Sequence, residues 1–191
     1  MDQLQEYLSY THRQHRRFID VMHQHFGVLE RDYVENIQFR PLLTSGGYGI
    51  DPWSKPMIFL NDTYLEDFHA DPRSSFGRLN LDTTIFHEAG HHLHYKYHGG
   101  KFYDVFTLEL IIDSAMVYYL KNNRMEDHIE NLSGDELVAL ELYHQLKGGK
   151  EFKQLLIVPE KEALDICISS LGIGHSYLKE REEYLKELEE E

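Results

Sequence analysis

Cysteine, basic residues and long apolar runs are all scarce in this sequence. Cys167 is the one cysteine among 191 residues, which excludes an internal disulfide framework and favours a reducing compartment. The chain has 19 Lys+Arg against 33 Asp+Glu, a formal net charge of −14. Because such a chain repels phosphate backbones and anionic lipid headgroups, we expect neither nucleic acid nor a membrane surface as a partner.

The most apolar stretch does not reach the length of a membrane span. It reads VFTLELIIDSAMVYYL at 105–120 and carries Glu109 and Asp113. The first residues, MDQLQEYLSY, lack a basic segment followed by an apolar core, so we expect no signal peptide and a cytoplasmic protein. An apolar content of 41% and this length predict one globular domain over 1–191.

The N-terminal part combines a helical pattern with a short β-rich region. Apolar residues recur at helical spacing over 2–35, where Gly27 is a point of bending or breaking. Two β-favouring runs, NIQFRPLL and KPMIFLND, flank the turn-rich stretch TSGGYGIDPWS. They predict a small, mostly antiparallel sheet at about 37–62. Residues 63–81 are expected to form an irregular surface loop.

The remainder of the chain is predicted to be helical. Asp82 is a candidate N-cap and Gly99-Gly100 a candidate helix end, which delimits a helix over 83–98. Further helices are expected at about 103–122, at 134–147, from Pro159 to the GIG at 172–174, and in the acidic, solvated tail YLKEREEYLKELEEE. The predicted fold class is therefore α+β, with a helical C-terminal part over 134–191.

The sequence His87-Glu88-Ala89-Gly90-His91 is the main chemical motif. On a helix, positions i and i+4 share one face, so both imidazoles can bind one tetrahedral ion. Glu88 lies about 100° around the helix, where it can accept a proton from a water on that ion as general base. The motif predicts one Zn²⁺ per chain, held by His87 and His91.

A family resemblance extends this interpretation. DTTIFHEAGHHLHYKY followed by DVFTLELIIDSAMVYYL resembles the gluzincin metallopeptidases, the thermolysin-like branch of the zincins. The resemblance implies a zincin-like fold, zinc-dependent hydrolysis of a peptide or protein substrate, Glu109 as third ligand and Asp113 orienting His87. The pattern departs from thermolysin at Leu108, where asparagine is usual, and at Ile112, where serine is usual.

The third ligand has rivals in the segment VPEKEALDI, where Glu160 and Glu162 are alternatives to Glu109. The apolar neighbours of Glu109 indicate a helix that is buried over much of its circumference, where a carboxylate needs a partner. A metzincin site is excluded by spacing, because His94 and Tyr97 stand where that family requires a glycine and a third histidine.

Several other residues could contribute to such a site. His94 and His98 continue the histidine stripe and are expected to line the cleft or to pack beneath the next helix. The group that stabilises the oxyanion is sought in His175 first, with His144, Tyr118 and Tyr119 as alternatives. In zincins an edge strand holds the substrate extended, and KPMIFLND is the candidate for that strand.

Two other functions remain open at this stage. A ferritin-like di-iron protein would use two Glu-x-x-His pairs, Glu88/His91 and Glu141/His144, together with Glu109 and Glu30. The second possibility is a non-catalytic interaction protein without metal. A metal assay separates the three hypotheses, because they require one zinc, two irons or no metal per chain.

Overall fold

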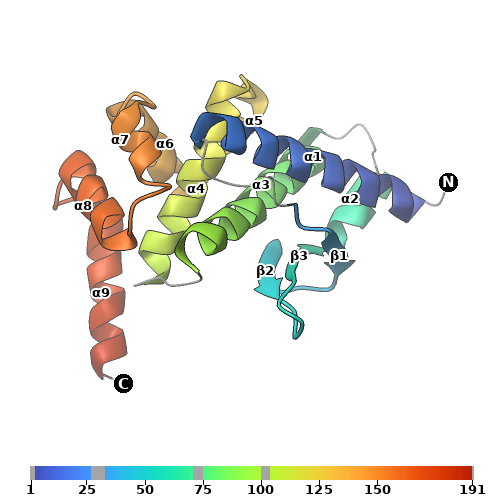
Figure 1. The fold of residues 1–191 in the computed structure, drawn as a ribbon, viewed down its shortest axis with the longest axis horizontal. Coiled ribbons are helices and arrows are strands. Elements are labelled where there is room, and N and C mark those ends of the chain that lie inside the picture. Colours follow the sequence, from blue (N-terminus) through green and yellow to red (C-terminus); the bar gives the residue numbers. More distant parts are fainter. Residues whose placement is uncertain (1–2, 27–32, 71–74, 100–103, 191) are drawn as a thin grey trace.

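The computed structural model describes residues 3–26, 33–70, 75–99 and 104–190. Within these ranges three short strands and a series of helices form an α+β fold (Figure 1). The helices are α1 (Gln3–Phe26), α2 (Thr63–Ala70), α3 (Ser75–His98), α4 (Val105–Asn122), α5 (Glu126–Glu130), α6 (Asp135–Gln145), α7 (Lys150–Gln154), α8 (Glu160–Leu171) and α9 (Ser176–Glu190).

The sheet is mixed, not mostly antiparallel as predicted. Its strands are β1 (Asn36–Arg40), β2 (Gly46–Ile50) and β3 (Pro56–Asn61), in the order β1-β3-β2. β3 pairs parallel with β1 and antiparallel with β2. The glycine-rich stretch that we predicted as a turn is therefore strand β2. The prediction that KPMIFLND forms an edge strand is wrong, because β3 is central and β1 and β2 are the edge strands.

α3 begins earlier than the sequence pattern indicated. Asp82 lies inside the helix, not at its N-cap, and is 2% exposed. Its carboxylate accepts a hydrogen bond from the Tyr10 hydroxyl (2.7 Å) and lies 3.1 Å from His128 Nε2, so it joins α1, α3 and α5. The predicted loop over 63–81 is replaced by α2 and the first turns of α3, with 71–74 outside the described residues. The predicted end at Gly99 is confirmed.

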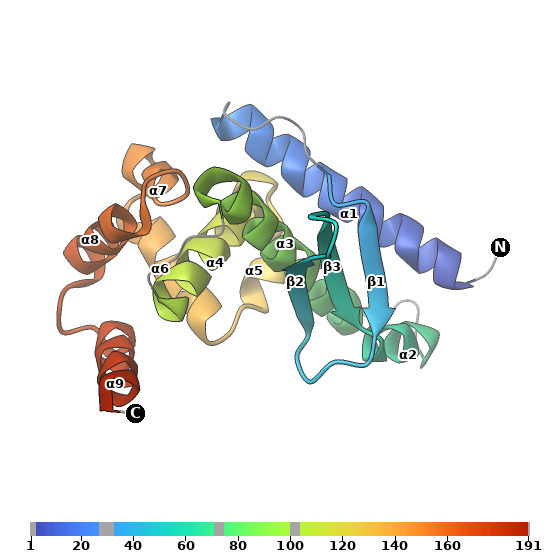
Figure 2. The same cartoon turned by 60° about the horizontal axis from the view of Figure 1, so that its bottom comes forward.

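α3 and α4 form the centre of the fold. Figure 2 shows α3 between the sheet and α4, and α1 packs along α3. Phe86 of α3 contacts Phe18 of α1 and Tyr119 of α4, with ring centroids 5.7 Å and 4.6 Å away. α4 is buried over most of its circumference, as its apolar composition predicted, and every residue from Leu110 to Leu120 is buried. α3 and α4 approach closely at Gly90, where a Cβ would lie 2.9 Å from Ile112 Cγ2.

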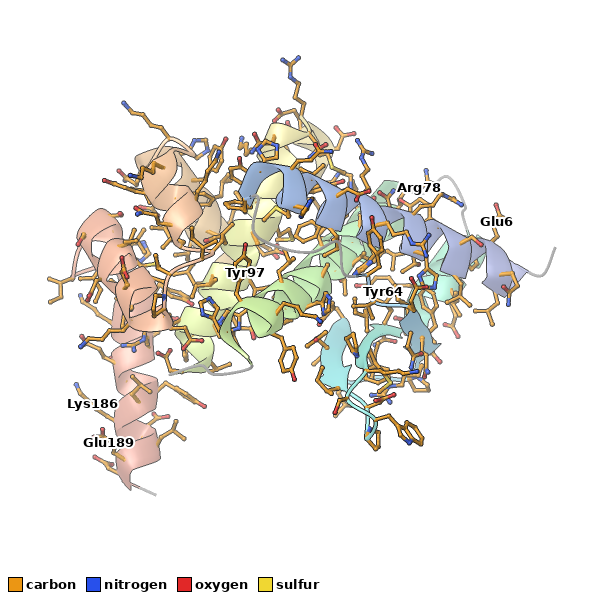
Figure 3. The ribbon with its side chains drawn as sticks, in the orientation of Figure 1. Glu6, Tyr64, Arg78, Tyr97, Lys186 and Glu189 are labelled. Atoms are coloured by element: carbon orange, nitrogen blue, oxygen red, sulfur yellow. The ribbon has the colours of Figure 1, made fainter. Side chains whose placement is uncertain are left out.

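Helices α6, α8 and α9 occupy the ranges predicted for the C-terminal part, whereas α5 and α7 were not predicted. α9 extends away from the rest of the molecule, and Lys186 and Glu189 lie on its projecting half (Figure 3). Its base is anchored by Arg181, whose Nη2 lies 2.7 Å from Asp104 Oδ2. The expectation of a solvated tail agrees with this, since most residues beyond Leu178 are exposed.

The N-terminal helix is shorter than the predicted 2–35. α1 ends at Phe26, and residues 33–35 are not helical. Gly27, the predicted point of bending or breaking, lies outside the described residues. Among the described helices, none has both the length and the apolarity to cross a membrane.

Candidate metal centre

Three side chains from two helices converge at the middle of the molecule. His87 and His91 lie one turn apart on α3, and Glu109 comes from the first half of α4. Their nearest atoms are His87 Nε2 and His91 Nε2 (3.2 Å), His87 Nε2 and Glu109 Oε2 (3.1 Å), and His91 Nε2 and Glu109 Oε2 (3.6 Å). In the described part of the chain this is the one group of three or more such ligands close enough to hold a metal ion.

The spacing of these three atoms suits a small tetrahedral ion. Ligand atoms at about 2.0–2.1 Å from a tetrahedral ion lie about 3.3–3.4 Å from one another. The three observed separations bracket that edge length without any rearrangement of the helices. Two imidazole nitrogens and one carboxylate oxygen also leave the fourth corner of the tetrahedron open.

Asp113 fixes the orientation of the first histidine. Its Oδ1 lies 2.8 Å from His87 Nδ1, and the Asp113 side chain is only 4% exposed. A proton on Nδ1 donated to this carboxylate leaves the Nε2 lone pair directed at Glu109 and His91. The structure therefore brings Asp113 to the position that the family resemblance implied.

The contacts of His87 and Glu109 shift their pKa values in opposite directions. Burial by itself lowers the pKa of His87, but its hydrogen bonds with Asp113 and Glu109 raise that pKa well above the usual value. Burial likewise raises the pKa of Glu109, and the hydrogen bonds to His87 and His91 outweigh it and lower the pKa to about 2. A carboxylate ionised at all ordinary pH values is suited to a cation at this position.

Glu88 is placed next to the three ligands and is 5% exposed. Its Oε2 atom has no hydrogen-bond partner among the described residues. Burial raises the pKa of Glu88, while nearby His87 and His91 lower it to a smaller extent. β2 approaches this carboxylate closely at Gly46, where a Cβ would lie 2.8 Å from Glu88 Oε1. A buried, unsatisfied carboxylate at this place is suited to accept a proton.

A cavity of about 430 Å³ opens over the three ligands and Glu88. One wall is formed by consecutive residues of the β1–β2 connection and β2, Thr44, Ser45, Gly46, Gly47 and Tyr48. The opposite wall is formed by α3, α4 and α6, with Thr83, Thr84, His87, Glu88, His91, Glu109 and Glu136. The open side of the candidate metal centre therefore faces a space large enough for part of a peptide.

Tyr48 is a site residue that the sequence analysis missed. Its ring is nearly parallel to the His91 ring (9° between planes, centroids 6.4 Å apart), and its hydroxyl lies 3.2 Å from Nδ1 of the buried His92. Tyr48 thereby supports the second histidine from the side of the sheet. The sequence did not indicate this role, because Tyr48 lies in a glycine-rich stretch that was predicted to be a turn.

The rival third ligands are placed elsewhere. Glu160 is 3% exposed, and its Oε1 lies 3.2 Å from Nε2 of His94, the next histidine along the stripe on α3. Glu162 is exposed and lines a different cavity with Glu151 and Asp165. His94 contacts Glu160 of α8, a helix distant in sequence that neither of its expected roles involved, and it does not line the cavity over the metal centre.

The candidates for stabilising an oxyanion do not reach the cavity wall. His175 lies 3.3 Å from Glu141, and the Tyr118 hydroxyl lies 2.8 Å from His25 Nδ1. Tyr119 is buried in the core, and His144 is exposed. None of His175, His144, Tyr118 and Tyr119 lines the cavity over the metal centre.

The ligand set for a di-iron site is not assembled in the described residues. Glu141 and His144 are both exposed, and neither belongs to a group of three converging ligands. Glu30 lies outside the described residues. His87, which a di-iron site would leave without a role, is instead a central member of the observed group.

No family model, curated protein or solved structure matches this chain. Its function is therefore inferred from the geometry of the site.

Proposed function

We propose that this chain is a zinc-dependent peptidase of the gluzincin type, with His87, His91 and Glu109 as the zinc ligands and Glu88 as the general base. The observation that carries the proposal is the convergence of three ligand atoms at tetrahedral spacing beside a buried carboxylate, on the floor of an open cavity. Two histidines and one glutamate with one open position form a ligand set characteristic of catalytic zinc.

The roles of the surrounding residues follow from their positions. A bound ion supplies a Lewis acid that polarises a substrate carbonyl and lowers the pKa of a nearby water. Glu88 removes a proton from the attacking water as its oxygen bonds to the carbonyl carbon. It then returns that proton to the amide nitrogen as the C–N bond breaks. Asp113 holds His87 in the tautomer that exposes its Nε2 lone pair.

The edge of β2 is the surface along which an extended substrate would lie. β2 is paired with β3 on one side only in the described sheet, and five consecutive residues at its start line the cavity. Main-chain hydrogen bonds to such an edge bind many peptide sequences. This assigns to β2 the role that the sequence analysis had given to β3.

The proposal is tested with Glu88→Gln. We expect hydrolysis of a fluorogenic peptide library to fall about 10²- to 10⁴-fold, because proton transfer is lost while all three ligands remain. Zinc content, measured by elemental analysis, should stay at one ion per chain. Glu141→Gln is the matched control, since this exposed glutamate lies outside the cavity and should leave the rate unchanged.

Two results would contradict the proposal. One is full hydrolytic activity in the Glu88→Gln variant. The other is a zinc-loaded wild-type chain that hydrolyses no member of the library.

A further inference from the structure

A second cavity, of about 450 Å³, adjoins the one over the metal centre. It is lined by Ser45, Tyr64, Asn80, Thr83, Thr84, Asn131, Ser133 and Glu136. Four of these residues, Ser45, Thr83, Thr84 and Glu136, also line the first cavity. The two cavities therefore adjoin along these four residues, and together they extend from the three ligands to the space between α2, α3 and the α5–α6 connection; we call them the cleft.

The walls of the second cavity are polar and internally braced. The Tyr64 hydroxyl (Tyr64 is labelled in Figure 3) lies 2.8 Å from Thr84 Oγ1, which links α2 to α3. Asn131 Nδ2 donates to Asn80 Oδ1 at 2.9 Å, which links the α5–α6 connection to α3. Hydroxyl and amide groups dominate the lining, and among the described residues that line the two cavities there is no lysine, arginine or aliphatic side chain.

Glu136 is the charged residue at the junction of the two cavities. It lies in the first turn of α6, where its Oε2 accepts a hydrogen bond from the Ser133 backbone N–H at 2.8 Å. This contact holds the start of α6, and it leaves acceptor capacity on a carboxylate that can take up to about four hydrogen bonds. The hydrogen bond to Ser133 does not require the Glu136 side chain to face the cleft. Glu136 nevertheless lines both cavities.

The electrostatic surroundings of Glu136 favour a cation. Burial raises the pKa of Glu136, and the nearby carboxylates of Asp113 and Asp135 also raise it, while the hydrogen bond from Ser133 N–H and the nearby His87 lower it to a smaller extent. The first cavity adds Glu88, whose buried Oε2 has no hydrogen-bond partner among the described residues. A cationic group in the second cavity would lie beside the Glu136 carboxylate, and the net charge of −14 would attract it from a distance.

We propose that the cleft selects peptides with a lysine or arginine side chain next to the scissile bond, and that Glu136 binds the cationic end of that side chain. This inference rests on the proposed peptidase function, because it places the cationic side chain next to the bond that is hydrolysed. The long polar side chain would extend past the shared residues Thr83 and Thr84 into the second cavity. Its N–H donors would meet the carboxylate and the amide and hydroxyl oxygens of the wall.

The test measures peptide binding, not turnover. The zinc-loaded Glu88→Gln variant is titrated with fluorescein-labelled peptides that differ only in one central residue: lysine, norleucine or glutamate. By fluorescence anisotropy we expect the lysine peptide to bind about fivefold more tightly than the norleucine peptide, with the glutamate peptide weakest. Raising the salt concentration should reduce the difference.

A second substitution assigns the preference to one residue. In Glu88→Gln/Glu136→Gln the lysine preference should disappear, while the amide oxygen of the new glutamine still accepts from Ser133 N–H and preserves the start of α6. The matched control is Glu88→Gln/Asp135→Asn. It makes the same change in net charge at an exposed neighbour that lines neither cavity, and it should keep the preference.

The outcomes separate this inference from the proposed function. Equal binding of the lysine and norleucine peptides, or an unchanged preference after Glu136→Gln, would overturn the inference even if the wild-type chain hydrolyses peptides. Selective binding of the lysine peptide by a chain that hydrolyses none would support the inference that Glu136 selects cationic side chains and overturn the peptidase proposal.

Discussion

Two histidine–glutamate groups lie along the same helix, and they differ in what their neighbours allow them to do. In one, His87 and His91 of α3 meet Glu109 of α4. In the other, His94 of α3 meets Glu160 of α8 at 3.2 Å. The residue types and the contact distances are similar.

The difference lies in convergence and access. The side chains of His94 and Glu160 are 5% and 2% exposed, and this pair does not belong to a group of three converging ligands in the described residues. The side chains of His87, His91 and Glu109 are 25%, 19% and 30% exposed and face a cavity. A buried pair stabilises the contact between two helices, whereas three converging ligands with an open side can hold an ion and a substrate.

The strongest test of this comparison is Glu109→Gln against Glu160→Gln. Loss of the Glu109 carboxylate should lower zinc affinity by more than the roughly 10- to 100-fold typical of an outer partner. Glu160→Gln should leave zinc affinity unchanged and lower the free energy of unfolding by about 1–3 kcal/mol, because it alters a buried polar contact between α3 and α8. Isothermal titration with zinc and chemical denaturation measure the two effects. Equal loss of zinc affinity in both variants would show that Glu109 is no more a zinc ligand than Glu160 is.

Asp113→Asn tests the orienting hydrogen bond. The amide oxygen can still accept from His87 Nδ1, but the negative charge that makes the imidazole a better ligand is lost. We expect zinc affinity to fall about 10- to 100-fold, measured by competition with a chelator. Unchanged affinity would show that His87 is held by packing alone.

The pH dependence of stability that His87 confers on the metal-free fold should disappear when zinc is bound. The pKa of His87 is raised in the metal-free fold, so its contribution to stability is complete below the unfolded pKa of about 6.5 and is lost as pH rises through the folded pKa. Zinc must displace that proton, so zinc affinity should rise about tenfold per pH unit up to the folded pKa.

Thermal unfolding between pH 6 and 9, with chelator and with zinc, measures both trends. Falling apparent stability with zinc across this range would contradict the proton displacement.

The smallest expected effect concerns Tyr48, the support of the second histidine. Tyr48→Ala should lower zinc affinity about two- to tenfold, because a ring contact beside His91 is lost. Tyr48→Phe keeps the ring and removes only the hydroxyl that contacts His92, so it should bind zinc as the wild type does. An equal loss of zinc affinity in both variants would instead assign the effect to the hydroxyl and not to the ring.

Local sequence patterns predicted the elements whose geometry is set within one helix. His87, Glu88 and His91 share a helix because four residues complete about one turn, and Gly99 ends that helix as expected. The same local reasoning failed for β2. The glycines of this stretch predicted a turn, but the structure has a strand there. Glycine is required at position 46 of that strand because a larger residue would collide with Thr84 and Glu88.

The start of α3 was missed for a related reason. Asp82 has the chemistry of an N-cap, but its carboxylate is used by Tyr10 and His128, which are distant in sequence. The neighbouring sequence of such a residue does not indicate whether its side chain caps a helix or makes tertiary hydrogen bonds.

By itself, the sequence determined that two imidazoles and a glutamate would share one helix, since helical periodicity depends only on neighbouring residues. Only the tertiary structure decided which distant carboxylate joined them. Glu109 and Glu160 both come from helices that pack on α3, and both meet a histidine of the same stripe. Glu109 reaches two histidines at once because α4 approaches α3 closely at Gly90, a contact between residues 22 positions apart (Gly90 and Ile112) that no local pattern encodes.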